Sequence, residues 1–99
     1  MIIDIIIVRG GKMHIQSGEV REIKIQVVNL ENKPFEIEFA RYQITDVHNN
    51  ILKEGTAIVK DNCISFMFDY TEVGRYVWDV FFNILDETFS SRGFVSVGY

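Results

Sequence analysis

Period-two alternation of apolar and polar residues is the feature that most limits what this chain can fold into. In the segment from 20 to 30, Ile23, Ile25 and Val27 alternate with charged or amide residues, as in a strand with one buried face. The same alternation recurs between turn-forming residues, and no window shows the spacing of an amphipathic helix over more than one turn. Isoleucine and valine supply 25 residues, leucine and alanine only 5, and β-branched side chains favour strands. The sequence therefore predicts an all-β fold.

The number and spacing of these segments predict an immunoglobulin-like β-sandwich of about seven antiparallel strands. A chain of 99 residues can bury one core without a metal or a disulfide, so residues 1–99 are predicted to form a single domain. In the third strand, 35–47, the apolar residues shift from odd positions (Ile37, Phe39) to even positions (Tyr42, Ile44). This shift predicts a β-bulge near Ala40 and Arg41. Asp61 and Asn62 predict a tight hairpin turn, and the segment "DETFSSRG" (86–93) is predicted to be a loop.

The stretch "VGRYVWDVFF" (73–82) predicts a tyrosine corner, in which a tyrosine hydroxyl bonds to backbone upstream. A turn containing Gly74 leads into a strand whose third residue is Tyr76. Trp78 and Phe82 follow Tyr76 at even spacing, so the three side chains point to the same face of the strand. They are predicted to fill the core, with a ligand platform as the alternative. The remaining predicted core residues are Val80, Ile84, Ile23, Ile25, Val27, Ile64, Phe66 and Phe68.

The opposite face of the same strand predicts a contact surface. Val77, Phe81 and Leu85 place apolar side chains on a face that is nominally exposed to solvent, and such residues can mark an interface. The first strand, "IIDIIIV" (2–8), contains no proline and one charge, so as an edge strand it would favour pairing with another chain. Lysine in place of Ile5 is expected to abolish association if that edge is the contact.

Composition and charge exclude several classes of function. The net charge is -4 and the basic residues form no run, so a nucleic-acid partner is not expected. Cys63 is the one cysteine, which rules out an intrachain disulfide and, without a basic neighbour, disfavours a catalytic thiolate. The opening "MIIDIIIV" is too short to span a bilayer and lacks a basic leader region, so neither a membrane anchor nor a signal peptide is expected.

No arrangement of residues predicts catalysis, a metal site or a cofactor. His14 and His48 lack partners at metal-ligand spacing. The segment "DVHNN" (46–50) offers oxygen ligands that calcium accepts, but its spacing is not that of an EF-hand, and a polar turn is the favoured interpretation. The segment "RGGK" (9–12) lacks the frame of a phosphate-binding loop. The protein is therefore predicted not to be an enzyme.

The order of the segments resembles the immunoglobulin-like module of phage tail and baseplate proteins. Members tend to open with a strand ending in Arg-Gly, matched here by Arg9 and Gly10. They close with G-x-Y-x-x-D, a hairpin and a last strand, matched by Gly74, Tyr76 and Asp79 and then by "RGFVSV" (92–97). The resemblance covers nearly the whole chain, although Gly11 and Lys12 stand where Asp and Thr are common.

That resemblance implies a structural role, in which the domain joins protein partners in a tail-type particle, is virion-associated, forms a homo-oligomer and needs no cofactor. The alternative is a β-sandwich that binds a glycan or a peptide through its loops, with aromatic side chains as stacking groups. The candidates for stacking are Tyr42, Tyr70, Phe89 and Tyr99.

Overall fold

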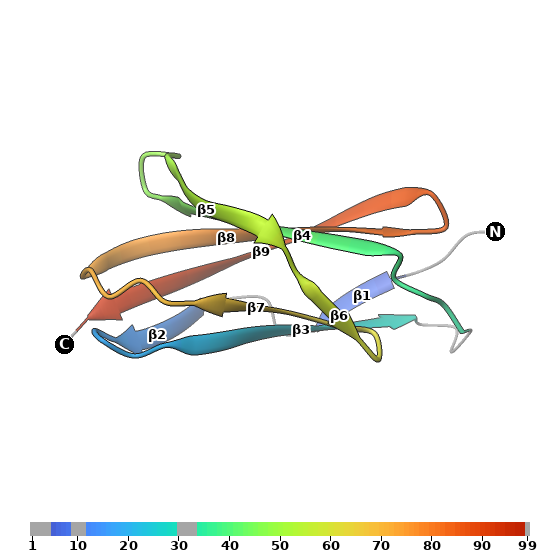
Figure 1. Cartoon of the computed structure of the whole chain (residues 1–99), viewed down its shortest axis with the longest axis horizontal. Helices are drawn as coiled ribbons and strands as arrows, with labels where there is room; N and C mark the ends of the chain where they lie inside the picture. The colour runs from blue at the N-terminus through green and yellow to red at the C-terminus, as the bar shows by residue number, and fades with distance from the viewer. Residues whose placement is uncertain (1–4, 9–11, 30–33, 99) are drawn as a thin grey trace.

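A computed structural model describes residues 5–8, 12–29 and 34–98 of the chain. These residues form two β-sheets that pack face to face (Figure 1). The strands are β1 (Ile5–Val8), β2 (Lys12–Gln16), β3 (Arg21–Asn29), β4 (Phe39–Asp46), β5 (Ile51–Thr56), β6 (Ile58–Lys60), β7 (Cys63–Phe68), β8 (Gly74–Ile84) and β9 (Glu87–Gly98). One sheet has the order β1-β3-β7-β6 and the other the order β2-β9-β8-β4-β5. Within these ranges no helix is present that could cross a membrane.

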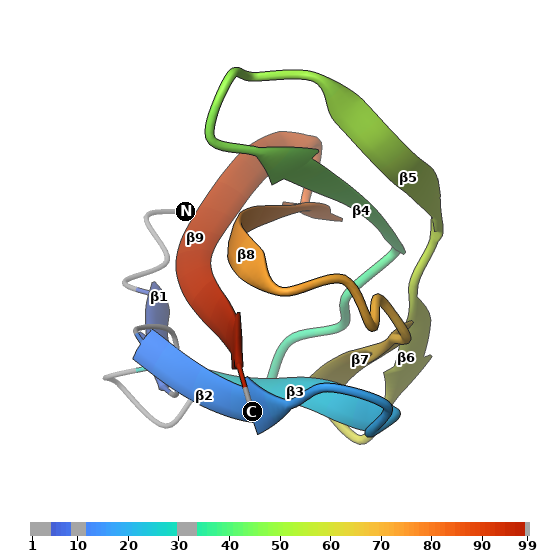
Figure 2. The same ribbon diagram turned by 90° about the vertical axis from the view of Figure 1, so that its left-hand side faces the viewer.

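The predicted all-β, immunoglobulin-like sandwich is confirmed, and Figure 2 shows the two layers from one end. Two details of the prediction are wrong. The described residues form nine strands instead of about seven, and one pair is parallel, because β2 runs alongside β9 in the same direction. The parallel pair arises because the chain leaves β1, which pairs with β3 of the four-stranded sheet, and joins the other sheet as β2. Sequence patterning cannot show such a change of sheet.

The predicted bulge near Ala40 and Arg41 is also wrong. The pairing of β4 with β8 is continuous from Phe39 to Asp46, and the irregularity lies between Ile44 and Thr45 in the pairing with β5. The apolar parity changes before β4, because Ile37 is buried in the segment that precedes the strand and Phe39 points away from the core. A change of parity thus marked the start of a strand and not a bulge within it.

The segment predicted as a loop, 86–93, is mostly part of β9. Leu85 and Asp86 both have positive φ and form a two-residue turn, so that β9 begins at Glu87 and pairs with β8 from its first residue. Phe89 stacks on Phe82 with ring centroids 5.6 Å apart. The predicted tight hairpin at Asp61 and Asn62 is confirmed, since both residues have positive φ between β6 and β7.

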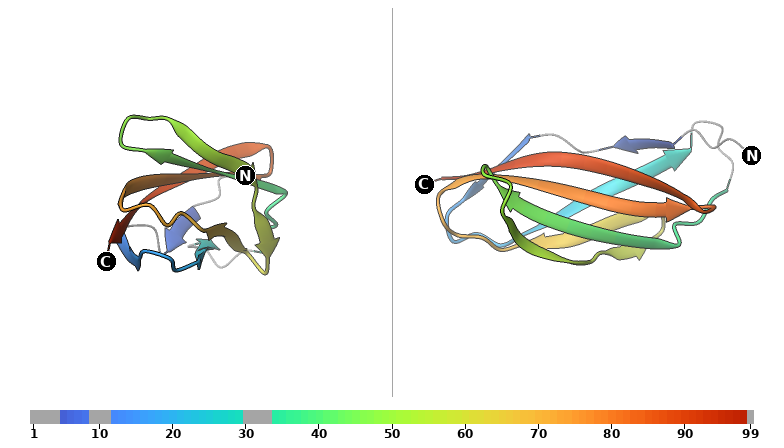
Figure 3. Two further views of the ribbon diagram at one scale, coloured as in Figure 1. Left: turned by 60° about the vertical axis from the view of Figure 1, so that its left-hand side comes forward. Right: turned by 90° about the horizontal axis from the view of Figure 1, so that it is seen from above.

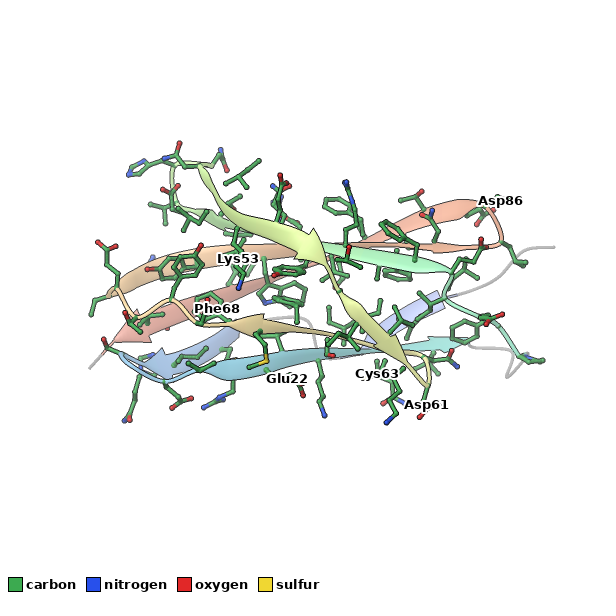
Figure 4. The ribbon with its side chains drawn as sticks, in the orientation of Figure 1. Glu22, Lys53, Asp61, Cys63, Phe68 and Asp86 are labelled. Carbon is green, nitrogen blue, oxygen red and sulfur yellow. The ribbon has the colours of Figure 1, made fainter. Side chains whose placement is uncertain are left out.

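The core lies between the sheets and contains every residue predicted for it. Phe68, for example, is fully buried between the two layers (Figure 4). Phe66 of β7 joins the sheets, because its ring stacks on Tyr42 of β4 at 4.7 Å and meets the edge of Trp78 of β8 at 5.7 Å. The core aromatic residues therefore hold one sheet against the other. The buried predicted residues are Ile23, Ile25, Val27, Ile64, Phe66, Phe68, Tyr76, Trp78, Val80, Phe82 and Ile84.

The turn before β8 is fastened by Tyr76. Its hydroxyl donates a hydrogen bond to the backbone carbonyl of Glu72, 2.6 Å away, which is the geometry of a tyrosine corner. The ring packs against Phe68 and Tyr70, and burial raises the pKa of the Tyr76 hydroxyl. Gly74 opens β8 two residues earlier, so the corner closes the turn directly onto the strand.

Tyr76→Phe is expected to lower the free energy of unfolding by about 1 kcal/mol, because the carbonyl of Glu72 loses its donor while the packing of the ring is kept. Urea denaturation followed by tryptophan fluorescence measures the change. An unchanged midpoint of unfolding would contradict a stabilising role for this bond.

Candidate functional site

The outer face of the five-stranded sheet has a four-strand part, formed by side chains that point away from the core on β9, β8, β4 and β5, and an edge strand, β2, which pairs with β9 from Phe94 to Gly98. These long strands lie side by side when the molecule is seen from above that sheet (Figure 3). Strand register aligns the outward side chains in rows that cross the sheet. The first row, called the apolar row here, consists of Phe94, Val77, Thr45 and Ile51 in successive strands.

Exposed and half-buried apolar side chains dominate the apolar row. Phe94 is 48% exposed and Ile51 is 55% exposed at its two ends. Val77 is half-buried between them, and Thr45 is buried, with its hydroxyl directed at the carbonyl of Val77. A row of this kind is unusual on a sheet face that carries no covering layer, because large exposed apolar groups are hydrated at a free-energy cost.

The second row, called the charged row, consists of Arg92, Asp79, Gln43 and Glu54. Arg92 Nε donates to Asp79 Oδ1 at 2.8 Å, and this hydrogen bond raises the pKa of the guanidinium. The side chain of Asp79 is mostly buried and keeps a charged partner, whereas the side chain of Arg92 is 65% exposed. At the opposite end of the row, Glu54 has no cationic partner among the described residues.

The third row, called the mixed row, consists of Ser90, Phe81, Arg41 and Thr56. Phe81 and Arg41 border a hollow of about 230 Å³, together with Gln43, Glu54 and Thr56. The hollow has room for part of one side chain and offers an aromatic ring, a guanidinium and a carboxylate. Beyond this row, Phe39 lies opposite Asn83 and is 45% exposed.

On β3, the outer face of the four-stranded sheet is polar. Glu22, Lys24 and Gln26 alternate with the core residues of β3 and point to solvent, and Lys24 Nζ lies 3.2 Å from Glu22 Oε1. Figure 4 shows Glu22 on the outer side of β3. Met67 and Ile58 are large exposed apolar residues on this face, on β7 and β6. The most exposed phenylalanine rings of the described residues, Phe94 and Phe39, both lie on the outer face of the five-stranded sheet.

The structure brings together two of the residues predicted for an interface and separates the other two. Val77 and Phe81 lie on the outer face of the five-stranded sheet. Leu85 does not continue their alternation, because β8 ends at Ile84 and Leu85 lies in the turn that follows. Ile5 begins β1, an edge strand of the other sheet.

Leu85 combines two unfavourable features. Its φ is 49°, in the left-handed region that asparagine and glycine tolerate better, and its side chain is 54% exposed. Leu85→Asn is therefore expected to raise the free energy of unfolding by about 0.5 to 1 kcal/mol. Thermal unfolding measures the change, with Leu52→Asn on exposed β5 as the control, where φ is negative and no gain is expected. A loss of stability in the Leu85 variant would contradict the inference that the backbone at Leu85 is strained.

The residues considered for chemistry do not assemble into a reactive site. His14 Nδ1 lies 3.0 Å from Ser96 Oγ on β9, whereas His48 lies in the turn after β4. The described residues contain no group of three or more histidine, cysteine or acidic side chains that could ligate a metal ion. Cys63 is half-buried on β7, paired with Gln26 and Lys60.

In the turn 46–50, the carboxylate of Asp46 organises the local backbone. It accepts hydrogen bonds from the backbone N–H groups of His48 and Asn50 and from the side-chain amide of Asn50. The side-chain bond from Asn50, then its backbone bond, lowers the pKa of Asp46. Both oxygens of Asp46 are therefore used within the turn, which favours the interpretation of this segment as a polar turn.

Three of the four aromatic residues considered for stacking on a ligand pack inward. Tyr42 stacks on Phe66, Tyr70 contacts Phe68 and Tyr76, and Phe89 stacks on Phe82. Tyr99, the fourth, lies outside the described residues, as do Arg9, Gly10 and Gly11 of the opening motif. The inward packing leaves Phe94 and Phe39 as the phenylalanines that are most exposed.

Comparison with known proteins finds likeness in structure alone. No family model and no curated protein matches the sequence. CopC from Methylosinus trichosporium OB3b superposes with a TM-score of 0.69 at 15% identity, over 97% of this chain and 93% of that one. Titin domain M7 superposes with a TM-score of 0.63 at 14% identity, over 98% and 97%. The shared fold is the immunoglobulin-like β-sandwich. An engineered protein also matches, with a TM-score of 0.67 at 7% identity, over 98% of this chain and 20% of that one.

Sequence reasoning missed four residues of the rows, namely Phe94, Ile51, Arg41 and Glu54. Phe94 on β9 is far in sequence from the residues on β4 and β5, and only the register of the pairs places all four on one face. One signal was available. In "FVSV" (94–97), Val95 and Val97 are the alternating core pair, so Phe94 had to point outward.

Proposed function

We propose that this protein is a non-catalytic immunoglobulin-like module that mediates protein–protein contacts in a larger assembly, through the outer face of its five-stranded sheet. The observation that carries the proposal is the apolar row on that face, flanked by the charged and mixed rows. Protein interfaces are enriched in aromatic residues and arginine, and this face carries Phe81, Phe94, Arg41, Arg75 and Arg92.

The finer assignment is a module of a phage or prophage tail-type particle. Its support is the sequence resemblance, and the matching residues contribute to contacts within the fold: Tyr76 forms the corner, and Asp79 pairs with Arg92. The alternative, glycan or peptide binding through loops, has less support, because Tyr42, Tyr70 and Phe89 pack against the core.

A photo-cross-linking experiment tests the proposal. The photoreactive residue benzoylphenylalanine replaces Phe94 in one variant and Met67 in another, and each is produced in cells of the source organism. The two sites have similar exposure, 48% and 43%, on opposite faces. We expect the chain to sediment with a large particle and to cross-link from position 94 but not from 67.

Two results would contradict the proposal. A chain that stays at the top of the gradient would refute the particle assignment. Equal cross-linking from both positions, or from neither, would refute the use of this face.

A further inference from the structure

The outer face of the five-stranded sheet is complementary to itself. Its charged row has a cation at one end and an anion at the other, Arg92 on β9 and Glu54 on β5, with β8 and β4 between them. A two-fold axis that runs parallel to the strands, midway between β8 and β4, exchanges β9 with β5 and β8 with β4. Such an axis would place Arg92 of one copy opposite Glu54 of the other.

The same axis matches the other rows without a further adjustment. In the apolar row, Phe94 faces Ile51 of the second copy. In the mixed row, Phe81 faces Arg41 of the second copy, an arrangement in which a guanidinium lies over an aromatic ring. Each of these contacts occurs twice in a symmetric dimer, so the favourable free energy of each contact is counted twice.

The centre of the charged row also meets a suitable group. Asp79 faces Gln43 of the second copy, whose amide can donate a hydrogen bond to a carboxylate. An axis placed instead across the strands at this row would bring Arg92 against Arg92 and Asp79 against Asp79. The alignment of the rows therefore selects the axis along the strands.

The area of the face fits a weak dimer. Four strands spaced at about 4.8 Å and outward residues from Arg75 to Asn83 at about 3.4 Å per residue cover roughly 500 Å² as a flat surface. Stable interfaces bury about 600 to 1,000 Å² on each partner, and smaller ones are typical of weak association. The outward charges of β9, β8, β4 and β5 come from Arg41, Arg75, Arg92, Asp79 and Glu54 and sum to +1 for each copy, whereas the whole chain carries -4.

We propose that the protein forms a symmetric dimer in which two outer faces of the five-stranded sheet pack together, with Arg92 paired to Glu54 and Phe94 packed on Ile51 across the two-fold axis. This inference rests on the proposed use of this face for protein contacts, and it names a second copy of the chain as the partner.

The first test is a charge reversal with a matched control. Light scattering over a hundredfold range of concentration gives the dissociation constant of the dimer. Glu54→Arg places two cations opposite each other at both ends of the charged row, so we expect the constant to rise at least about tenfold. Glu22→Arg makes the same change in net charge on the opposite face, and Ile5→Lys changes an edge strand; both are expected to leave the dimer unchanged. Circular dichroism confirms the folding of each variant.

The second test measures whether Phe94 of one copy lies opposite Ile51 of the other. In a Cys63→Ser background, the Phe94→Cys and Ile51→Cys variants are treated with a short bis-maleimide, separately and as a mixture. This reagent replaces oxidation because facing residues of packed sheets have Cα atoms about 10 Å apart, beyond the roughly 7 Å reach of a disulfide. The mixture is expected to form a cross-linked dimer. Each variant alone is not, because three strand spacings of about 4.8 Å add to the distance between its two copies.

A monomer at every concentration, equal effects of Glu54→Arg and Glu22→Arg, or self-linking of either cysteine variant would overturn the dimer. These results differ from a failure of the proposed function. A monomer that still cross-links from position 94 to another protein of the particle would refute the second copy as the partner and leave the use of the face intact.

Discussion

Gly93→Ala is expected to lower the free energy of unfolding by about 3 kcal/mol, although it adds a single methyl group. A Cβ at position 93 would lie well inside van der Waals contact with the indole of Trp78, at Cζ2 and Cε2. Gly93 and Trp78 are directly opposite each other in the β8 and β9 pair, and both are buried. The ring cannot move away easily, because Phe66 packs against it from the other sheet.

The size of this effect follows from the overall stability of small domains. A domain of this length has about 5 to 15 kcal/mol of stability, and a loss of 1 kcal/mol lowers its Tm by about 4 to 8 °C. We therefore expect the Tm of the Gly93→Ala variant to fall by at least about 12 °C in differential scanning calorimetry.

A matched control is Gly55→Ala. A Cβ at position 55 would lie 3.4 Å from the ring of Tyr42, an ordinary contact, so we expect a change below about 1 kcal/mol. A double-mutant cycle tests the role of the indole. In a Trp78→Leu background, Gly93→Ala should cost less stability, because the smaller leucine side chain leaves room for the added methyl group. Equal costs of Gly93→Ala in both backgrounds would show that the indole is not the cause.

The sequence predicted the fold well because the signals of this fold are local. Alternation identified the core faces of β3, β7 and β8, and residues such as Ile25, Phe66 and Val80 could be assigned from their own strands. The errors came from relations between strands. Three features depend on which strands become neighbours: the parallel pairing of β2, the irregularity opposite Thr45 and the extent of β9. The sequence of one strand does not show which strands will pair with it.

The candidate site was predictable in part for the same reason. Val77 and Phe81 were found because both lie on one strand with an apolar outer face. Leu85 was misplaced because the alternation continues through a turn that reverses the chain. Phe94, Ile51 and Glu54 join the site only through cross-strand register. The complementarity of the face is therefore a property of the sheet and is visible only once the strand order is known.

Phe66→Ala is expected to lower the free energy of unfolding by about 3 to 5 kcal/mol, the usual cost of emptying a buried phenylalanine site. Phe66 is 3% exposed, and its ring contacts both Tyr42 and Trp78 of the opposite sheet. The substitution removes the contact between β7 and the strands β4 and β8, so the two sheets lose a shared anchor. Guanidinium denaturation measures the loss.

Phe94→Ala is the matched control, because it makes the same chemical change on the outer face. Phe94 is 48% exposed, so we expect its loss to change the free energy of unfolding of the monomer by less than about 1 kcal/mol while weakening self-association in light scattering. If Phe94→Ala cost as much stability as Phe66→Ala, the ring would belong to the core. A loss of stability for Phe66→Ala alone, together with weaker self-association for Phe94→Ala, would show that Phe66 holds the sheets together and that Phe94 is presented to a partner.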